Sequence, residues 1–299
     1  MSTALAWLAE PLAYAFLQRS LAAAVMVAIV CALVGSFVVL RGMAFMGDAL
    51  AHTILPGIAI GYLVGRGARG PLFAWGLGTA VVAALAIGAI ARRARLREDT
   101  AIGVLFAGFF ALGIALISST GGYAVDLAHF LFGDVLGVGR TDLVRTAVFG
   151  LGILAVLAVF YRGFLILSFD PVFAATLRLP TRPLHDLLLV LVAVTVVVAL
   201  QTVGIAMTVA MLVTPPATAR LVCRRLPAMM ATAAGFGAVS AVAGIYLSYY
   251  AGVASGAAIV LVATLLFLAV FGLTGLRRRD PPRSPPHQGQ PTTRGQPRR

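Results

Sequence analysis

Lysine is absent from this chain: all 23 basic residues are arginine. A conventional P-loop needs the lysine of GxxxxGK(S/T) to hold the nucleotide phosphates. A Schiff-base mechanism needs a lysine amine. The chain therefore holds neither a conventional P-loop ATPase site nor a lysine-based covalent site.

Charged side chains of either sign are scarce. They make up 11% of the residues, against about 25% in a soluble domain. Hydrophobic residues make up 61%, and the mean hydropathy is +1.00. Apolar runs of roughly 20 residues recur, each long enough to cross about 30 Å of hydrocarbon. The runs do not alternate with polar residues as barrel strands do, so we expect an all-α, polytopic integral membrane protein.

Enzyme motifs are also missing. HExxH, GxSxG and CxxC do not occur. The two cysteines, Cys31 and Cys223, lie in or beside apolar runs without metal-motif spacing, and we expect them to be small core residues. The opening segment has no basic residues before its apolar part, so a cleaved signal peptide is not expected. We therefore predict a chain that is no enzyme and binds no cofactor of its own.

Arginine placement sets the expected orientation. A formal charge of +13 on a soluble protein would suggest a nucleic-acid partner. Here the arginines gather in short loops and in the C-terminal tail, as the positive-inside rule expects, so we predict no nucleic-acid partner. With the arginine-rich loop 91–100 in the cytoplasm, the N-terminus is expected outside and the C-terminus inside.

The order of apolar and polar segments predicts eight to nine transmembrane helices. The Gly-rich segment 119–143 is too polar for a full span, and its part 127–137 is expected to form a short or re-entrant helix. The polar segment 168–187 contains three prolines and is expected to be a helical loop. The expected spans are 20–40, 50–65, 72–91, 101–118, 143–161, 187–206, 207–222 (broken at the TPP of 214–216), 228–250 and 256–275.

Composition changes abruptly after Leu276. Residues 277–299 are rich in arginine, proline and glutamine and have almost no apolar side chain, so they cannot bury a core. We expect a membrane domain over 1–276 and a disordered cytoplasmic tail over 277–299. The tail arginines could contact anionic membrane lipid.

Two ionisable residues, Asp48 and His52, interrupt one of the apolar stretches. Positions i and i+4 share a helix face, so the carboxylate and the imidazole should project the same way. Together they suit Mn(II), Zn(II) or Fe(II), and an ionisable residue inside a membrane is by default functional. The structural alternative is that Asp48 caps a helix and His52 bonds a carbonyl. Gly47, Pro56 and Gly57 bracket the pair, so we expect an interrupted helix here.

A second polar cluster contains Asp126, His129 and Asp134. Asp126 and His129 are spaced i, i+3 and could share a face, which would allow a metal contact or a gate. Structural roles are the alternative: Asp126 as the N-cap of the short helix, and Asp134 in a Gly-rich turn. His129 is the favoured metal contact of the three.

The loop 168–187 is a candidate docking segment. It places Asp170 before an amphipathic stretch with Phe173 and Leu177, and it ends in basic residues. A transporter without its own nucleotide site needs a partner, and such a loop could dock on one. The alternative is an ordinary interfacial helix with snorkelling arginines.

Four blocks of sequence resemble a known family. They are GSFVVLRGMAFMGDALAHTILPGIAIGYLVG, LFGDVLGVGRTDL, SFDPVFAATLRLPTRPLH and VVALQTVGIAMTVAMLVTPPATARL. Together they resemble the permease subunits of zinc, manganese and iron ABC importers. The resemblance covers about residues 15–275, in the same order and at similar spacing, and leaves out only the tail.

The resemblance implies a fold, a function and partners. The fold would be similar to that of the cobalamin and iron-siderophore importer permeases. Such permeases form a homodimer with the pathway along the subunit interface. Two copies of a separate ATPase bind from the cytoplasm, and an extracytoplasmic metal-binding protein delivers the ion. The chain would then be a non-catalytic subunit that works by alternating access in the plasma or inner membrane of a bacterium.

The resemblance also implies roles for particular residues. In the family the GDxxxH block is associated with metal coordination, which favours Asp48 and His52, while members vary around His129. The loop 168–187 would be the coupling segment that fits a cleft on the ATPase. Its candidate residues are Asp170, Pro171, Phe173, Ala174, Ala175 and Arg178. The block TPPATARL is expected to shape the pathway through a helix break at Pro215 and Pro216.

Two rival interpretations stay open. A secondary transporter driven by an ion gradient would need no ATPase, although no inverted repeat is visible and intramembrane carboxylates are few. A membrane scaffold or enzyme subunit without transport would tolerate alanine at Asp48 and His52. The cargo itself is not decided by these residues, because carboxylate and imidazole serve zinc, manganese and iron alike.

Overall fold

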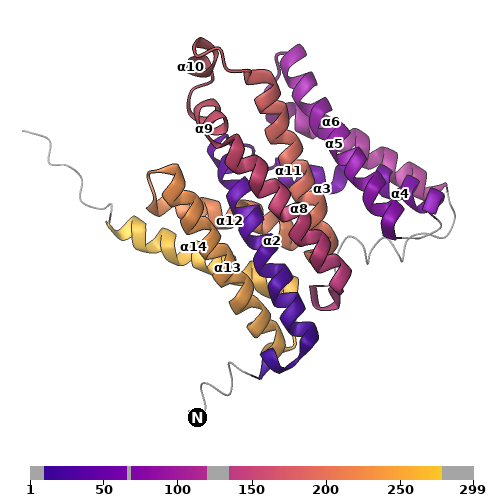
Figure 1. Ribbon diagram of the computed structural model, residues 1–299, viewed down its shortest axis with the longest axis vertical. Helices are drawn as coiled ribbons and strands as arrows, with labels where there is room; N and C mark the ends of the chain where they lie inside the picture. The colour runs from indigo at the N-terminus through magenta and orange to yellow at the C-terminus, as the bar shows by residue number, and fades with distance from the viewer. Residues whose placement is uncertain (1–9, 66–68, 120–134, 278–299) are drawn as a thin grey trace, which may run out of the picture.

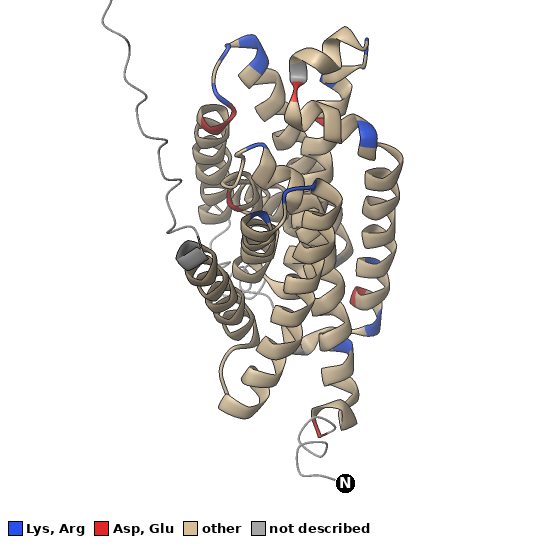
Figure 2. Ribbon diagram, turned by 90° about the vertical axis from the view of Figure 1, so that its left-hand side faces the viewer, with Lys and Arg blue, Asp and Glu red and all other residues tan. Residues whose placement is uncertain are grey.

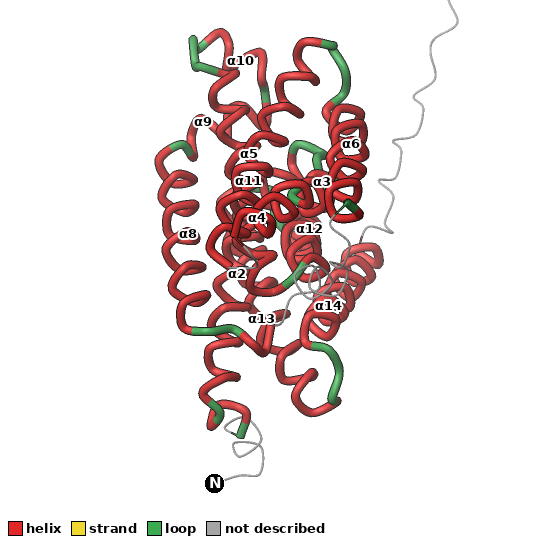
Figure 3. The backbone as a smooth tube through the Cα atoms, turned by 90° about the vertical axis from the view of Figure 1, so that its right-hand side faces the viewer, coloured by secondary structure: helices red, strands yellow, loops and turns green. Residues whose placement is uncertain are grey.

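The computed structural model describes residues 10–65, 69–119 and 135–277, and this part of the chain consists of helices and turns without a strand (Figures 1 and 3). Nine helical segments in it are long and apolar enough to cross a membrane, with α3 and α4 counted as one. The predicted all-α membrane fold is confirmed. The helices are α2 (Ala15–Leu40), α3 (Met46–Thr53), α4 (Leu55–Gly65), α5 (Arg69–Arg93), α6 (Glu98–Ser118), α8 (Arg140–Val159), α9 (Tyr161–Phe169), α10 (Pro171–Thr176), α11 (Thr181–Val203), α12 (Ile205–Val222), α13 (Leu226–Ala251) and α14 (Ser255–Arg277), with short 3-10 turns η1 (Pro11–Ala13) and η2 (Val135–Gly137).

Helices α2 and α11 form the centre of the bundle. In their most apolar stretches 61% and 72% of the residues are buried, whereas the share is 17% in both α6 and α14. The outer helices turn large apolar side chains outward, among them Val104 of α6 and Leu265 of α14. A surface of this kind suits hydrocarbon rather than water, so the bundle has the burial pattern of a membrane domain.

The second span consists of two helices, as its Gly and Pro residues predict. Helix α3 ends at Thr53 and α4 begins at Leu55, with Ile54 between them. Pro56 has no N–H to donate to the carbonyl of His52, which accepts from the Ile54 N–H instead. The break therefore lies directly after the ionisable pair and separates it from α4.

Some helices begin earlier than the approximate predicted bounds. Helix α2 begins at Ala15 and α3 at Met46, earlier than the expected starts at 20 and 50. Hydropathy locates the apolar part of a span, whereas the backbone hydrogen bonds of a helix continue into polar flanks such as Gln18. The predicted helical loop 168–187 contains the end of α9, all of α10 and the beginning of α11.

Helix α12 runs from Ile205 to Val222 without a break, although it contains Pro215 and Pro216. The predicted break was therefore wrong. A proline lacks the N–H that would bond to the carbonyl four residues earlier, so Pro216 leaves the carbonyl of Leu212 without its helical donor. That carbonyl lies against Gly35 of α2, where a Cβ would overlap it. Close packing against a neighbouring helix supports the proline-containing turn.

Two predictions fall largely outside the described residues. The short helix expected over 127–137 is described only at Val135–Gly137, where the chain forms the turn η2. The expected tail, 277–299, is described only at Arg277, the last residue of α14. Its predicted disorder stays a prediction.

The two ends of the bundle differ in character. Helix α10 and the loop between α5 and α6 lie at the end opposite the N-terminus (Figures 1 and 3). Most of the blue segments in Figure 2, which mark arginine in this chain, lie toward that same end. The basic loop 91–100 and the candidate docking segment therefore share one end of the molecule, as the arginine count along the sequence predicts.

Candidate functional site

Asp48 and His52 project from one face of α3. The carboxylate Oδ1 lies 3.7 Å from the imidazole Nε2, as the i, i+4 spacing predicts. The side chains are 37% and 27% exposed, respectively, whereas Ala49, Leu50 and Ala51 between them are fully buried. Helix α3 thus buries its apolar face in the bundle and presents both ionisable groups at a partly open surface.

Two phenylalanines of α6 hold the imidazole of His52. Phe106 and Phe110 make T-shaped contacts with it, with ring centroids 5.7 and 5.6 Å away, and the two phenyl rings stack on each other. His52 Nδ1 is buried without a hydrogen-bond partner in the described part of the chain. The ring is therefore fixed by apolar contacts, with one nitrogen facing Asp48 and the other unpaired.

The donor set suits a transition-metal ion but is incomplete. Carboxylate and imidazole are ligands for Mn(II), Fe(II) and Zn(II). Stable sites use four or more ligands, and no group of three His, Cys, Asp or Glu side chains with metal-binding geometry occurs among the described residues. Such a pair can contact a passing cation without holding it tightly. The other predicted candidates, Asp126, His129 and Asp134, lie outside the described residues.

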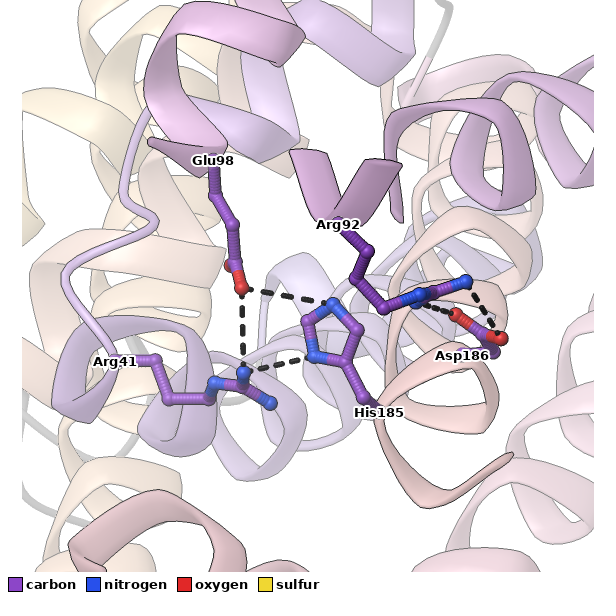
Figure 4. A network of polar contacts seen from close by, with 5 residues as sticks. All are labelled: Arg41, Arg92, Glu98, His185 and Asp186. Carbon is purple, nitrogen blue, oxygen red and sulfur yellow. Dashed lines mark hydrogen bonds and ion pairs between the residues drawn. The ribbon is translucent and has the colours of Figure 1, made fainter. Parts of the chain in front are cut away.

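A partly buried polar network that the sequence did not predict joins three separate helices (Figure 4). Arg41, the C-cap of α2, donates from Nη2 to His185 Nδ1 at 2.7 Å. The same nitrogen lies 3.4 Å from Glu98 Oε1 at the start of α6. His185 Nε2 lies 3.5 Å from that carboxylate oxygen. Burial lowers the pKa of the Arg41 guanidinium, and the Glu98 carboxylate acts in the opposite direction.

A second ion pair lies next to this network. Arg92 in the last turn of α5 donates to both carboxylate oxygens of Asp186, at 2.5 and 3.1 Å. Asp186 directly follows His185 in α11. A bidentate guanidinium–carboxylate pair fixes both distance and orientation. It therefore holds the first turns of α11 against the end of α5.

Sequence reasoning missed these groups for a clear reason. Arg41 and Glu98 are 57 residues apart, and Arg41 and His185 are 144 apart. Spacing arguments reach only partners on one helix. A usable signal was present nonetheless, because each residue is an ionisable group at the boundary of an apolar run, where pairing is the usual way to satisfy a charge.

Helix α10 is a short amphipathic element. The Asp170 carboxylate accepts hydrogen bonds from the N–H groups of Val172 and Phe173, each at 2.9 Å, and so caps the helix. Val172 and Phe173 are 74% and 52% exposed, whereas Ala174 is fully buried. Of the other predicted coupling residues, Ala175 and Arg178 are exposed, and Pro171 is the first residue of the helix. The segment presents apolar side chains at an exposed surface, with Ala174 buried beneath them.

The fold and these sites define a polytopic helical membrane protein with a partly exposed ionisable pair on one of its membrane spans and an exposed short helix at one end. This is the architecture of a membrane transport protein. Residues 13–274 match the ABC 3 transport family, and the chain belongs to that family.

Relatives with known names and structures agree with this membership. The chain is 50% identical over 260 residues to the manganese transport system membrane protein MntC of Halalkalibacterium halodurans, covering 87% of this chain and 88% of that protein. PsaBC from Streptococcus pneumoniae in complex with Fab contains a chain that matches with a TM-score of 0.78 and 38% identity, covering 90% of this chain and 95% of that one. An inward-facing metal-chelate type ABC transporter matches with a TM-score of 0.70 at 16% identity, which is a likeness of fold alone.

Proposed function

We propose that this chain is the membrane-spanning permease subunit of an ATP-driven importer for a divalent first-row transition metal ion. The observation that carries the proposal is the Asp48–His52 pair, two metal-type donors 3.7 Å apart on one face of a membrane helix. Manganese is the first candidate for the cargo, because the relative that is 50% identical over 260 residues is named for manganese transport.

The incomplete donor set supports a transport role. An ion that crosses a membrane must exchange water for protein ligands that are favourable enough to admit it and weak enough to release it. Asp48 and His52 supply two such ligands, and water or a second subunit would supply the rest. The partly open position of the pair leaves room for these additional ligands.

A second copy of the chain is the natural neighbour at this surface. In a homodimer with the pathway along the subunit interface, the two α3 pairs would face each other and present four donors. The share of buried residues is only 17% in α6, the helix that lies beside His52. A partner subunit and membrane lipid would together cover such outward-facing helices.

Energy would come from a separate cytoplasmic ATPase dimer. The chain has no lysine and hence no conventional P-loop of its own. The exposed Val172 and Phe173 of α10, fixed by the Asp170 cap, would dock in the ATPase. ATP binding and hydrolysis would then move α10 and shift the paired permeases between outward and inward states.

The end that carries α10 would face the cytoplasm of a bacterial cell, in the plasma or inner membrane. The basic loop between α5 and α6 lies at this end, which agrees with the positive-inside rule. The N-terminus would lie outside, where an extracytoplasmic metal-binding protein would deliver the ion, and the C-terminus would be cytoplasmic.

Uptake of Mn(II) into cells that express the complete importer tests the proposal. Asp48→Asn and His52→Gln should each lower uptake by at least about tenfold, because each removes a ligand. Asp99→Asn is the matched control, since Asp99 is an exposed carboxylate of α6 that pairs only loosely with Arg97 at 3.9 Å. Unchanged uptake in both Asp48→Asn and His52→Gln would refute the metal contact.

The energy source separates the proposal from the rival secondary transporter. Depleting ATP while the ion gradients are clamped should stop uptake. Collapsing the gradients with ionophores at constant ATP should leave uptake unchanged. The opposite pattern would identify a gradient-driven transporter, and an ATPase that copurifies with the chain would argue against both rivals.

A further inference from the structure

The guanidinium of Arg41 lies between a carboxylate and an imidazole lone pair. Arginine only donates hydrogen bonds, so the His185 Nδ1 that receives Arg41 Nη2 at 2.7 Å must be the unprotonated ring nitrogen. In the neutral ring the proton is then on Nε2, which faces Glu98 Oε1 at 3.5 Å. Glu98 Oε1 also lies 3.4 Å from the same guanidinium nitrogen. Two electron-pair donors therefore converge on one positively charged group (Figure 4).

These donors are of the same types as those of the Asp48–His52 pair. One oxygen and one imidazole nitrogen again form a set suited to a divalent transition metal. The difference is that the Arg41 guanidinium occupies the position between the Glu98 oxygen and the His185 nitrogen. The guanidinium is not fully satisfied there, because Arg41 Nη1 is buried without a hydrogen-bond partner among the described residues.

The network lies on the α10 side of the first pair. Glu98 begins α6, the helix whose Phe106 and Phe110 hold His52. Glu98 and Phe106 are eight residues apart, about 12 Å along a helix. Arg41, the C-cap of α2, lies five residues before Met46, where α3 begins. The two donor pairs therefore lie at successive levels along α6, which carries Glu98 and contacts His52 through Phe106.

His185 is also close in sequence to the proposed docking helix. Helix α10 ends at Thr176 and α11 begins at Thr181, with His185 in the second turn of α11. The Arg92–Asp186 pair joins the neighbouring residue of α11 to α5. A displacement of α10 would reach His185 through the residues 177–184, while Arg41 and Glu98 belong to other helices.

We propose that Glu98 Oε1 and His185 Nδ1 form a second contact for the divalent cation, and that Arg41 is a tethered cation which occupies this contact until the metal ion displaces it. The inference rests on the proposed function, because it takes the cargo to be a divalent metal ion. The proposal adds a second cation site between the Asp48–His52 pair and the α10 end of the bundle. The Arg41 side chain blocks this site when no metal ion is bound. Movement of α10 separates His185 from Arg41 and opens the contact to the ion.

Mn(II) binding to the purified permease–ATPase complex in nanodiscs tests the second contact directly. Loss of the free Mn(II) electron paramagnetic resonance signal measures the bound ion. The test uses an Asp48→Asn/His52→Gln background, which removes the first pair. In that background Arg41→Met should bind Mn(II) at least about tenfold more tightly, because the positive charge that competes for the two donors is removed. Adding Glu98→Gln or His185→Leu to Arg41→Met should abolish this gain.

Arg41→Lys is the matched control, since it keeps a positive charge on a long side chain and should give no gain in Mn(II) binding. If the Arg41→Met complex does not assemble, Arg41→Gln removes the charge while keeping a polar group, and the same gain is expected. In the chain that keeps Arg41, Glu98→Gln and His185→Gln should each lower Mn(II) uptake by about tenfold or more.

Two results would overturn the second contact. One is an assembled Arg41→Met or Arg41→Gln complex that binds no additional Mn(II), which would reduce the network to a structural ion pair. The other is full uptake in both Glu98→Gln and His185→Gln. The proposed function fails separately, by unchanged uptake in Asp48→Asn and His52→Gln, and that result would leave a gain of Mn(II) binding at Glu98 and His185 intact.

Discussion

Gly35 of α2 and Leu212 of α12 are in backbone contact: the Leu212 carbonyl lies where a side chain on Gly35 would begin. The contact joins a central helix to a helix that contains two adjacent prolines. Pro216 has no N–H to donate to the Leu212 carbonyl, so this turn of α12 lacks a helical hydrogen bond. The packing against Gly35 supports the turn instead.

Gly35→Ala should therefore destabilise the protein. The new methyl group overlaps backbone atoms that cannot rotate away, so α2 and α12 must separate, at a cost of roughly 1–3 kcal/mol. Gly78→Ala in α5 is the control, because a Cβ there meets no atom within 4 Å. Thermal unfolding of the purified protein in detergent measures both. Equal melting temperatures for the two variants would show that the contact is dispensable.

Arg92 and Asp186 should be energetically coupled. Their side chains are 35% and 27% exposed, so solvent screens the bidentate pair, and we expect a coupling of about 0.5–1 kcal/mol. A double-mutant cycle with Arg92→Ala and Asp186→Ala, read from thermal unfolding, isolates this energy. The Arg97–Asp99 pair is the reference: its side chains are 87% and 53% exposed and 3.9 Å apart, so its cycle should give no coupling.

Asp170→Ala should weaken α10 and, with it, the proposed docking of the ATPase. The substitution removes the acceptor for two N–H groups and costs about 1 kcal/mol of helix stability. Asp170→Ser keeps a capping oxygen and should retain both docking and uptake. Copurification of the ATPase and Mn(II) uptake report on the two effects. If Asp170→Ser fails as badly as Asp170→Ala, the carboxylate itself and not the cap is needed.

Phe106→Ala should lower metal uptake without loss of protein from the membrane. The ring fixes His52 by an edge contact at 5.7 Å between centroids, and its removal frees the imidazole to leave the Asp48 side. Uptake should fall by about tenfold, in the range found when groups that orient metal ligands are removed. Phe271→Ala, on the outward face of α14, is the control and should transport normally. A normal rate in Phe106→Ala would show that α3 alone orients His52.

Local pattern predicted much of the fold and the first part of the site. The apolar runs located all nine candidate spans, because each span is defined by its own residues. The shared face of Asp48 and His52 followed from helical spacing alone. The interrupted helix near Pro56 followed from the missing N–H of proline.

Relationships between distant segments could not be predicted in this way. Pro215 and Pro216 suggested a broken helix, but the support for that turn comes from Gly35, which is far away in sequence. His185 falls in the predicted helical loop 168–187. In the structure it belongs to α11, and Arg41 of α2 and Glu98 of α6 lie beside it. Such pairings result from tertiary packing and cannot be read from the spacing of residues along one segment.

The joint at Ile54 divides the second span into two halves. Helix α4 packs closely on α5 through glycines: Gly57 contacts Thr79, and Gly61 and Gly65 contact Pro71. Helix α3 is only eight residues long and lies on the other side of the joint. The joint lets α3 take an orientation in the bundle that does not continue the axis of α4. The direction in which Asp48 and His52 project is therefore set by the packing of α3 against its neighbours and not by the axis of α4.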